Sequence, residues 1–156
     1  MVSSRGDWVL LSYRIPREPS TPRIAIWRKL KDLGVAQIVD GLVALPGNDR
    51  TRERLQWIAV SVREAGGEAL VWDADLSARA DGAGLRDAMS ADRTREYENL
   101  LADVEASASS DGRTIRKWRR AWQAIKRRDY FDAPGADGAR LAIAERAGAD
   151  LPEVAS

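Results

Sequence analysis

The densest group of charged side chains in this sequence is a run of basic residues between Asp111 and Asp129. Residues 111–131 contain eight basic and two acidic side chains, a net charge of +6, although the formal net charge of the whole chain is only +1. Guanidinium and ammonium groups at this density can neutralise the phosphates of a nucleic-acid backbone. The run therefore predicts a surface that binds DNA or another polyanion. Its members are Arg113, Arg116, Lys117, Arg119, Arg120, Lys126, Arg127 and Arg128.

An acidic segment that precedes this run, residues 85–106, offers a second interpretation of the same cations. If both segments are helices packed as a hairpin of opposite charge, the basic residues can pair with carboxylates instead of with a ligand. A third interpretation is a protein-interaction domain whose basic helix meets an acidic partner. The sequence leaves these interpretations open. The acidic residues concerned are Asp87, Asp92, Glu96, Glu98, Asp103 and Glu105.

Two smaller groups could also hold a ligand. Arg95, Glu96 and Tyr97 are consecutive, and in a pocket they could bind a small molecule and transfer a proton, as in an enzyme on a dimeric ferredoxin-like scaffold. The alternative is that Tyr97 belongs to the core while the other two lie on the surface. Arg14 and Arg17 follow an expected strand. Together with Arg95 they are candidates for binding an oxyanion, which guanidinium groups recognise well.

Several classes of chemistry are excluded or disfavoured. Cysteine and histidine are absent, which excludes disulfides, thiolate or imidazole metal sites and histidine-dependent triads. The end of the first expected strand carries Ser12, Tyr13 and Arg14 instead of a carboxylate, which argues against a metal-dependent nuclease. Gly82 and Gly84 do not follow a strand as a phosphate-binding loop does. We expect no metal and no cofactor, and a binding protein rather than an enzyme.

The sequence contains no candidate membrane segment. No apolar run reaches the ~20 residues of a membrane span, and no basic-then-apolar signal segment opens the chain. We therefore expect a cytoplasmic protein that makes no contact with a membrane.

The elements that must position these residues begin with a sheet domain over residues 1–76. Alternating apolar residues predict the strands, and Asp40-Gly41 is a strong hairpin signal because both residues tolerate positive φ. The order strand, helix, strand, strand, helix, strand predicts an α+β, ferredoxin-like antiparallel sheet with two helices on one face. The first strand should lie in its interior, and the open face is expected to pair in a homodimer. The expected ranges are strands at 8–14, 35–39, 42–46 and 68–73 and helices at 22–33 and 50–65.

Residues 77–156 are expected to form a C-terminal helical extension. A flexible linker at 77–84 should lead into an acidic helix at 85–106, a basic helix at 113–128 and a short helix at 141–147. In the basic helix four apolar residues share one face, which should pack inward. They are Ile115, Trp118, Trp122 and Ile125.

A set of short motifs runs along most of the chain. They are Trp8–Arg14 with Pro16 and Pro19, then Arg23, Trp27, Leu30 and Gly34, then Val43-Ala44-Leu45-Pro46, Gly66-Gly67, Arg95-Glu96-Tyr97, Lys117-Trp118-Arg119-Arg120 and Arg128-Asp129-Tyr130-Phe131. In order and spacing they resemble the N-terminal domain of the chromate resistance protein ChrB family. The sheet part also resembles, more faintly, the C-terminal domain of PaaX-type repressors.

This resemblance implies a role in chromate resistance. It suggests a cytoplasmic accessory protein or a chromate-responsive transcriptional regulator that binds promoter DNA. Its ligand would be chromate or another oxyanion. Full-length members of that family carry a second, C-terminal domain.

Overall fold

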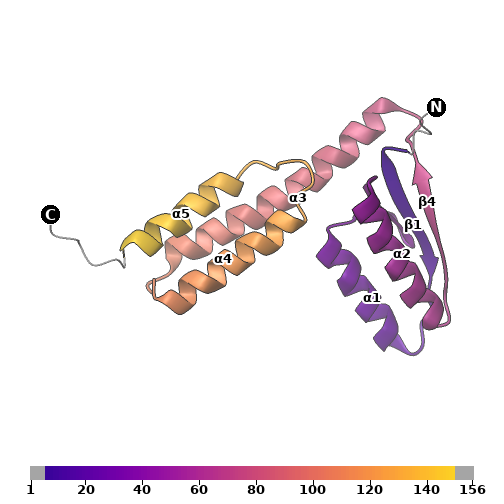
Figure 1. Cartoon of the computed structure of the whole chain (residues 1–156), viewed down its shortest axis with the longest axis horizontal. Coiled ribbons are helices and arrows are strands. Elements are labelled where there is room, and N and C mark those ends of the chain that lie inside the picture. The colour runs from indigo at the N-terminus through magenta and orange to yellow at the C-terminus, as the bar shows by residue number, and fades with distance from the viewer. Residues whose placement is uncertain (1–5, 150–156) are drawn as a thin grey trace. The chain divides into compact units, whose positions relative to one another are not determined.

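The computed structural model describes residues 6–149, and the chain divides into two compact units, Met1–Leu85 and Arg86–Ser156. The first unit contains a four-stranded sheet with two helices, and the second is helical (Figure 1). No helix within residues 6–149 is long and apolar enough to cross a membrane.

The sheet of the first unit confirms the predicted α+β, ferredoxin-like fold class. Its strands are β1 (Trp8–Arg14), β2 (Ala36–Val39), β3 (Leu42–Pro46) and β4 (Glu68–Ala74). They are ordered β2-β3-β1-β4, and every neighbouring pair is antiparallel. β1 therefore lies in the interior, as its apolar sequence predicts. Leu10 of β1 stands opposite Ala44 on one side and Trp72 on the other.

Two helices, α1 (Ser20–Leu33) and α2 (Asp49–Glu64), cover one face of this sheet (Figure 1). α1 ends at Gly34, whose φ of 75° is a left-handed conformation that glycine adopts without strain. α2 begins with a capping box, because the Asn48 side chain accepts a hydrogen bond from the Thr51 amide and the Thr51 hydroxyl accepts one from the Asn48 amide. The core beneath the helices includes Val9, Leu11, Leu30, Val43, Leu45, Leu55 and Val62, all 0% exposed.

The predicted hairpin at Asp40-Gly41 joins β2 to β3 and lies against the end of β1. The Tyr13 amide donates a hydrogen bond to the Gly41 carbonyl at 2.8 Å. Gly41 has a φ of 77°, and a Cβ atom at this position would lie 2.6 Å from the Tyr13 carbonyl oxygen. Only glycine therefore fits here, and the turn is fixed beside Arg14, where the loop to α1 begins.

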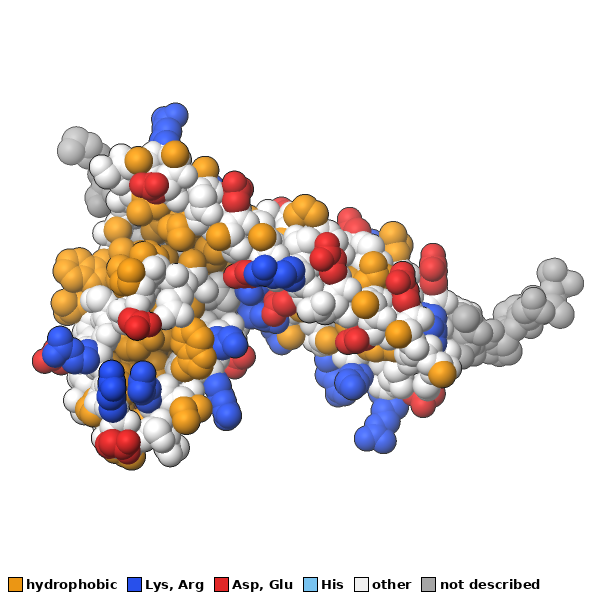
Figure 2. Space-filling view, turned by 180° about the vertical axis from the view of Figure 1, so that it is seen from behind, with side chains coloured by type: hydrophobic (Ala, Val, Ile, Leu, Met, Phe, Trp, Pro, Cys, Tyr) orange, Lys and Arg blue, Asp and Glu red, His pale blue; other side chains and the backbone are white. Residues whose placement is uncertain are grey.

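The face of the sheet opposite α1 and α2 carries exposed apolar side chains. Leu70 is 56% exposed and Trp72 is 48% exposed. The Trp72 indole donates a hydrogen bond to the Ser12 hydroxyl at 2.9 Å, which places both side chains on this face. In Figure 2, hydrophobic side chains gather over the first unit. The expected pairing of this face in a homodimer stays a prediction.

The second unit contains α4 (Gly112–Arg127), α5 (Ala136–Ala149) and most of α3 (Arg79–Ala106). The apolar face of α4 packs inward as predicted, although Trp122 is only partly buried. Its indole donates a hydrogen bond to the Ala136 carbonyl at 2.8 Å, which joins α4 to the start of α5. The core of the unit includes Tyr97, Leu100, Val104, Ile115, Trp118, Ile125, Ala139 and Ile143.

Two boundaries differ from the predicted ones. The flexible linker predicted at 77–84 is wrong, because α3 already begins at Arg79. Alanine and arginine are good helix formers, and Asp81 lies in the first turn, where the helix dipole stabilises a carboxylate. These effects offset the free energy by which Gly82 and Gly84 destabilise the helix. α5 is also longer than the predicted helix at 141–147.

Candidate functional site

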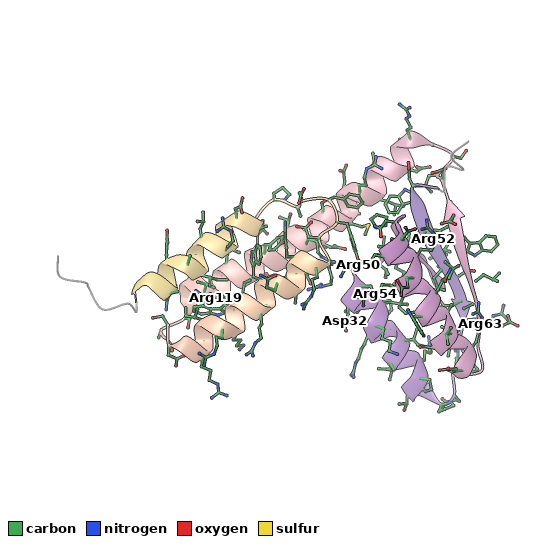
Figure 3. All side chains as sticks on the ribbon, viewed as in Figure 1. Asp32, Arg50, Arg52, Arg54, Arg63 and Arg119 are labelled. Carbon is green, nitrogen blue, oxygen red and sulfur yellow. The ribbon has the colours of Figure 1, made fainter. Side chains whose placement is uncertain are left out.

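Six basic side chains of α4 are exposed, five of them on the side opposite its apolar face, while Arg119 lies beside Trp122 and lines a small cleft with α5. We call this set the basic face of α4, and it consists of Arg113, Arg116, Lys117, Arg119, Arg120 and Arg127. Figure 3 marks Arg119 on this helix, and in Figure 2 basic side chains project from one edge of the second unit. The two other predicted cations, Lys126 and Arg128, are half-buried.

Ion pairing with α3 accounts for only one of the eight predicted cations. Arg128 Nη1 lies 2.6 Å from Glu96 Oε1 of α3, whereas Lys126 pairs with Asp132, outside α3, at 3.5 Å. No residue of the basic face forms an ion pair within the part of the chain that the structure describes. Pairing with the acidic helix, one of the interpretations of the sequence, therefore leaves six cations available to a partner.

Specific contacts hold α4 in place at its N-terminal end. The Asp111 carboxylate accepts a hydrogen bond from the Thr114 amide at 2.8 Å and caps the helix. This bond lowers the pKa of Asp111 below its ordinary value. On α5, Arg146 donates hydrogen bonds to the carbonyls of Val104 and Ser107, at 3.0 and 2.7 Å. Its guanidinium also lies 5.7 Å from the centre of the Trp118 ring. The loop before α4 is therefore tied to α5, so the basic face sits on a fixed element.

Arg95, Glu96 and Tyr97 lie in three different surroundings. Tyr97 is 0% exposed, in the core of the second unit, and its hydroxyl donates a hydrogen bond to Asp129 Oδ2 at 2.9 Å. Burial, followed by this hydrogen bond, raises the pKa of Tyr97 well above its ordinary value. The Arg95 side chain is 70% exposed and pairs with Asp92.

Glu96 forms ion pairs with two arginines. It lies between Arg128 and Arg93, whose Nε is 2.8 Å from Glu96 Oε2. Oε1 accepts a hydrogen bond from Arg128, whereas Oε2 is close enough to Arg93 for an ion pair but accepts no hydrogen bond from it. Glu96 therefore takes part in ion pairs, whereas the Tyr97 hydroxyl is hydrogen-bonded to Asp129.

Arg14 and Arg17, in contrast, line one cleft of about 860 Å³ in the first unit. Arg23 of α1 lines the same cleft, so three guanidinium groups come together from the end of β1, the β1–α1 loop and α1. Tyr13 and Trp27 are also part of the wall. Burial, and then the charge of Asp40, raise the pKa of Tyr13, while the charge of Arg23 opposes them. Arg95, the third oxyanion candidate, belongs instead to the ion pair in α3.

Arg23 and Trp27 line the cleft, but they are not among the site residues predicted from the sequence. The spacing of α1 assigns Trp27 to the core together with Leu30, but Leu30 is 0% exposed and Trp27 is 39% exposed. A signal was present, because Ser20, Arg23 and Trp27 follow the i, i+3, i+7 spacing of a second face of the helix. Nothing in the sequence showed that this face meets the end of β1.

Within residues 6–149, no group of three or more acidic side chains is arranged to hold a metal ion. The basic face of α4 and the cleft lined by Arg14, Arg17 and Arg23, which we call the three-arginine cleft, both carry an excess of basic side chains that form no ion pair among the described residues. Both are therefore suited to binding anions.

Comparisons with known proteins agree with the motifs of the sequence. The family model described as "Protein ChrB, N-terminal" matches residues 23–110, a stretch that ends just before α4. The chain is also 29% identical over 137 residues to Protein ChrB of Cupriavidus metallidurans. That alignment covers 83% of this chain and 42% of the relative, so the chain spans less than half of the relative's length. No solved structure matches the chain.

Proposed function

Because the chain belongs to the family of ChrB N-terminal domains, we propose that it acts in chromate resistance as a regulator that binds DNA through the basic face of α4. The observation that carries this proposal is the set of six exposed cations on a single helix that form no ion pair with any described residue. Chromate or another oxyanion is the effector that the family resemblance implies.

The geometry of α4 suits a nucleic-acid backbone. Four arginines of the basic face form one stripe along the helix, because their positions follow the i, i+3, i+7, i+14 pattern. They are Arg113, Arg116, Arg120 and Arg127. A helix of 16 residues is about 24 Å long, and the major groove of DNA admits an α-helix. The opposite, apolar side is occupied by the core of the unit, so α4 can present only its basic side to a partner.

An enzyme that uses Arg95, Glu96 and Tyr97 is not favoured by this arrangement. The buried Tyr97 hydroxyl is engaged by Asp129, and Glu96 is engaged by two arginines. A protein-interaction domain would use the same basic face with an acidic partner, and it is distinguished from the DNA-binding proposal by experiment.

The decisive experiment is a salt titration of binding to the promoter DNA upstream of the chain's own gene, measured by fluorescence anisotropy. We compare the wild type with the double variant Arg116→Ala/Arg120→Ala. The observed log affinity should fall with log salt at a slope of about −0.9 for each phosphate contact. If both arginines contact phosphates, the double variant should lose about 1.8 from that slope and bind more weakly at every salt concentration.

The matched control is Arg50→Ala/Arg54→Ala on α2, which removes two exposed arginines with the same one-turn spacing (Figure 3). It changes the net charge by the same amount but should leave the slope unchanged. Circular dichroism establishes that all variants are folded. An unchanged slope in Arg116→Ala/Arg120→Ala, or an equal loss in the control, would reject the basic face as the DNA surface. A wild type with no affinity for DNA but a measurable affinity for an acidic peptide would favour the interaction domain.

A further inference from the structure

The three-arginine cleft of the first unit has the features of a binding site in its own right. It lies entirely within residues 13–41 and does not involve α4, so an inference about its ligand does not rest on DNA binding. Its wall combines basic, aromatic, apolar and acidic side chains from β1, the β1–α1 loop, α1 and the β2–β3 hairpin.

The positive part of the cleft is built to receive an anion. Arg14, Arg17 and Arg23 form no ion pair with any residue in the range 6–149. Ser20 at the start of α1 also lines the cleft, and this helix has neither a side-chain cap nor an acidic residue in its first turn. Its free amide groups and helix dipole therefore add to the positive potential that the guanidinium groups create.

Tyr13 adds a hydrogen-bond donor beside these cations. Its phenol lines the cleft, and the raised pKa keeps it protonated at neutral pH. A protonated phenol can donate to a phosphate or carboxylate oxygen, which arginine also binds with two parallel hydrogen bonds.

Other features of the wall do not suit a bare inorganic oxyanion. The volume of about 860 Å³ falls in the range of clefts that hold drug-sized organic molecules. Trp27 and Ile24 present apolar surface that a small oxyanion cannot cover, and they are 39% and 48% exposed. Lys31 lies 5.7 Å from the centre of the Trp27 ring, which steadies the indole.

Asp40 also discriminates between ligands. It lines the cleft and receives a weak hydrogen bond of 3.4 Å from the Gln37 amide. Its carboxylate can accept a hydrogen bond from a hydroxyl or amino group, which a bare inorganic dianion does not carry. The cleft therefore matches a ligand with an anionic end, a planar apolar part and a hydrogen-bond donor.

We propose that this cleft binds an organic phosphate of mononucleotide size. The arginines and the start of α1 hold the phosphate, the Trp27 indole stacks on a planar ring, and Asp40 accepts a hydrogen bond from a hydroxyl or amino group. This places a small-molecule site beside the end of β1, with Arg23 and Trp27 of α1 in its wall.

The experiment is isothermal titration calorimetry of the whole chain with the 5′-monophosphates of adenosine, guanosine, cytidine and uridine. Ribose 5-phosphate, inorganic phosphate, sulfate and chromate are titrated in parallel. We expect saturable binding of at least one mononucleotide and affinities at least about tenfold lower for the inorganic anions, because stacking of a base on an aromatic ring contributes roughly a five- to hundredfold gain.

Variants test each part of the site. Arg17→Ala and Arg23→Ala should each weaken mononucleotide binding by about tenfold or more, as expected for loss of a charged hydrogen bond. Trp27→Ala should weaken mononucleotide binding but leave the affinity for ribose 5-phosphate unchanged. The matched control is Arg28→Ala, which removes an exposed arginine of α1 that does not line the cleft.

Three outcomes would overturn the proposal. One is the absence of binding by all four mononucleotides to the folded protein at millimolar concentration. Another is inorganic phosphate, sulfate or chromate binding as tightly as the best mononucleotide, which would make the cleft an inorganic oxyanion site. The third is an equal loss of affinity in Arg28→Ala and Arg23→Ala, which would indicate a general effect of charge.

Discussion

Removal of a single hydroxyl group tests whether Tyr97 stabilises the second unit through Asp129. In Tyr97→Phe the ring keeps its packing, and the 2.9 Å hydrogen bond to Asp129 Oδ2 is lost. A hydrogen bond to a charged acceptor contributes roughly 1.5–3 kcal/mol. We expect a loss near the lower end, about 1.5 kcal/mol, because the Asp129 carboxylate still accepts a hydrogen bond from the Ala133 amide at 2.9 Å. The measurement is guanidinium denaturation of both proteins at neutral pH, followed by circular dichroism of the helices.

The same hydrogen bond predicts how the difference in stability depends on pH. The pKa of Tyr97 is raised above 10.0, first by burial and then by Asp129. Above pH 10 the unfolded chain therefore loses a proton that the folded protein keeps, and the free energy of unfolding falls as the pH rises. Phenylalanine has no such proton, so the advantage of the wild type should be complete below pH 10 and shrink above it. Equal stabilities at neutral pH, or an advantage that grows above pH 10, would refute this reasoning.

The remaining predictions compare the same substitution at two positions. Trp118→Ala should lower the free energy of unfolding by about 3–5 kcal/mol, because the Trp118 side chain is only 6% exposed. Trp57 is 64% exposed, so Trp57→Ala should lower the free energy of unfolding very little. Similar losses for the two variants in a denaturation experiment would contradict the assignment of Trp118 to the core. Gly41→Ala should destabilise more than Gly66→Ala. Both have positive φ, which costs an alanine about 1–2 kcal/mol, but only at Gly41 would the added Cβ lie 2.6 Å from the Tyr13 carbonyl oxygen.

The sheet could be predicted from the sequence because its signals are local. Asp40-Gly41 between two β-branched runs specifies the hairpin, and the apolar run Trp8–Arg14 specifies an interior strand. Once those two signals are combined with the helical periods, only a few topologies remain. The inward face of α4 could be predicted for the same reason, since the spacing of Ile115 and Trp118 is a property of one helix.

The cleft could not be predicted in full because it depends on which helix face meets which strand end. Arg14 and Arg17 are near one another in sequence, and they were recognised as candidates for an oxyanion. Arg23 and Trp27 join them only through the packing of α1 on the sheet. The start of α3 could not be predicted for a different reason. Gly82 and Gly84 suggest a linker, but each glycine destabilises a helix by only about 1 kcal/mol, and a helix as long as α3 remains stable despite this loss.

The cations of α4 fall into two groups, those that form an ion pair with a described residue and those that do not. Arg128 contributes to the fold, since it joins α4 to Glu96 of α3 and also donates a hydrogen bond to the Ala124 carbonyl. The basic face forms no ion pair with any residue that the structure describes. Its like charges at i, i+4, such as Arg116 and Arg120, destabilise a helix by about 0.2–0.5 kcal/mol for each pair. A helix whose only task was to close the core would gain stability by losing these charges. A polyanionic partner would offset this repulsion, and DNA is the partner that we propose.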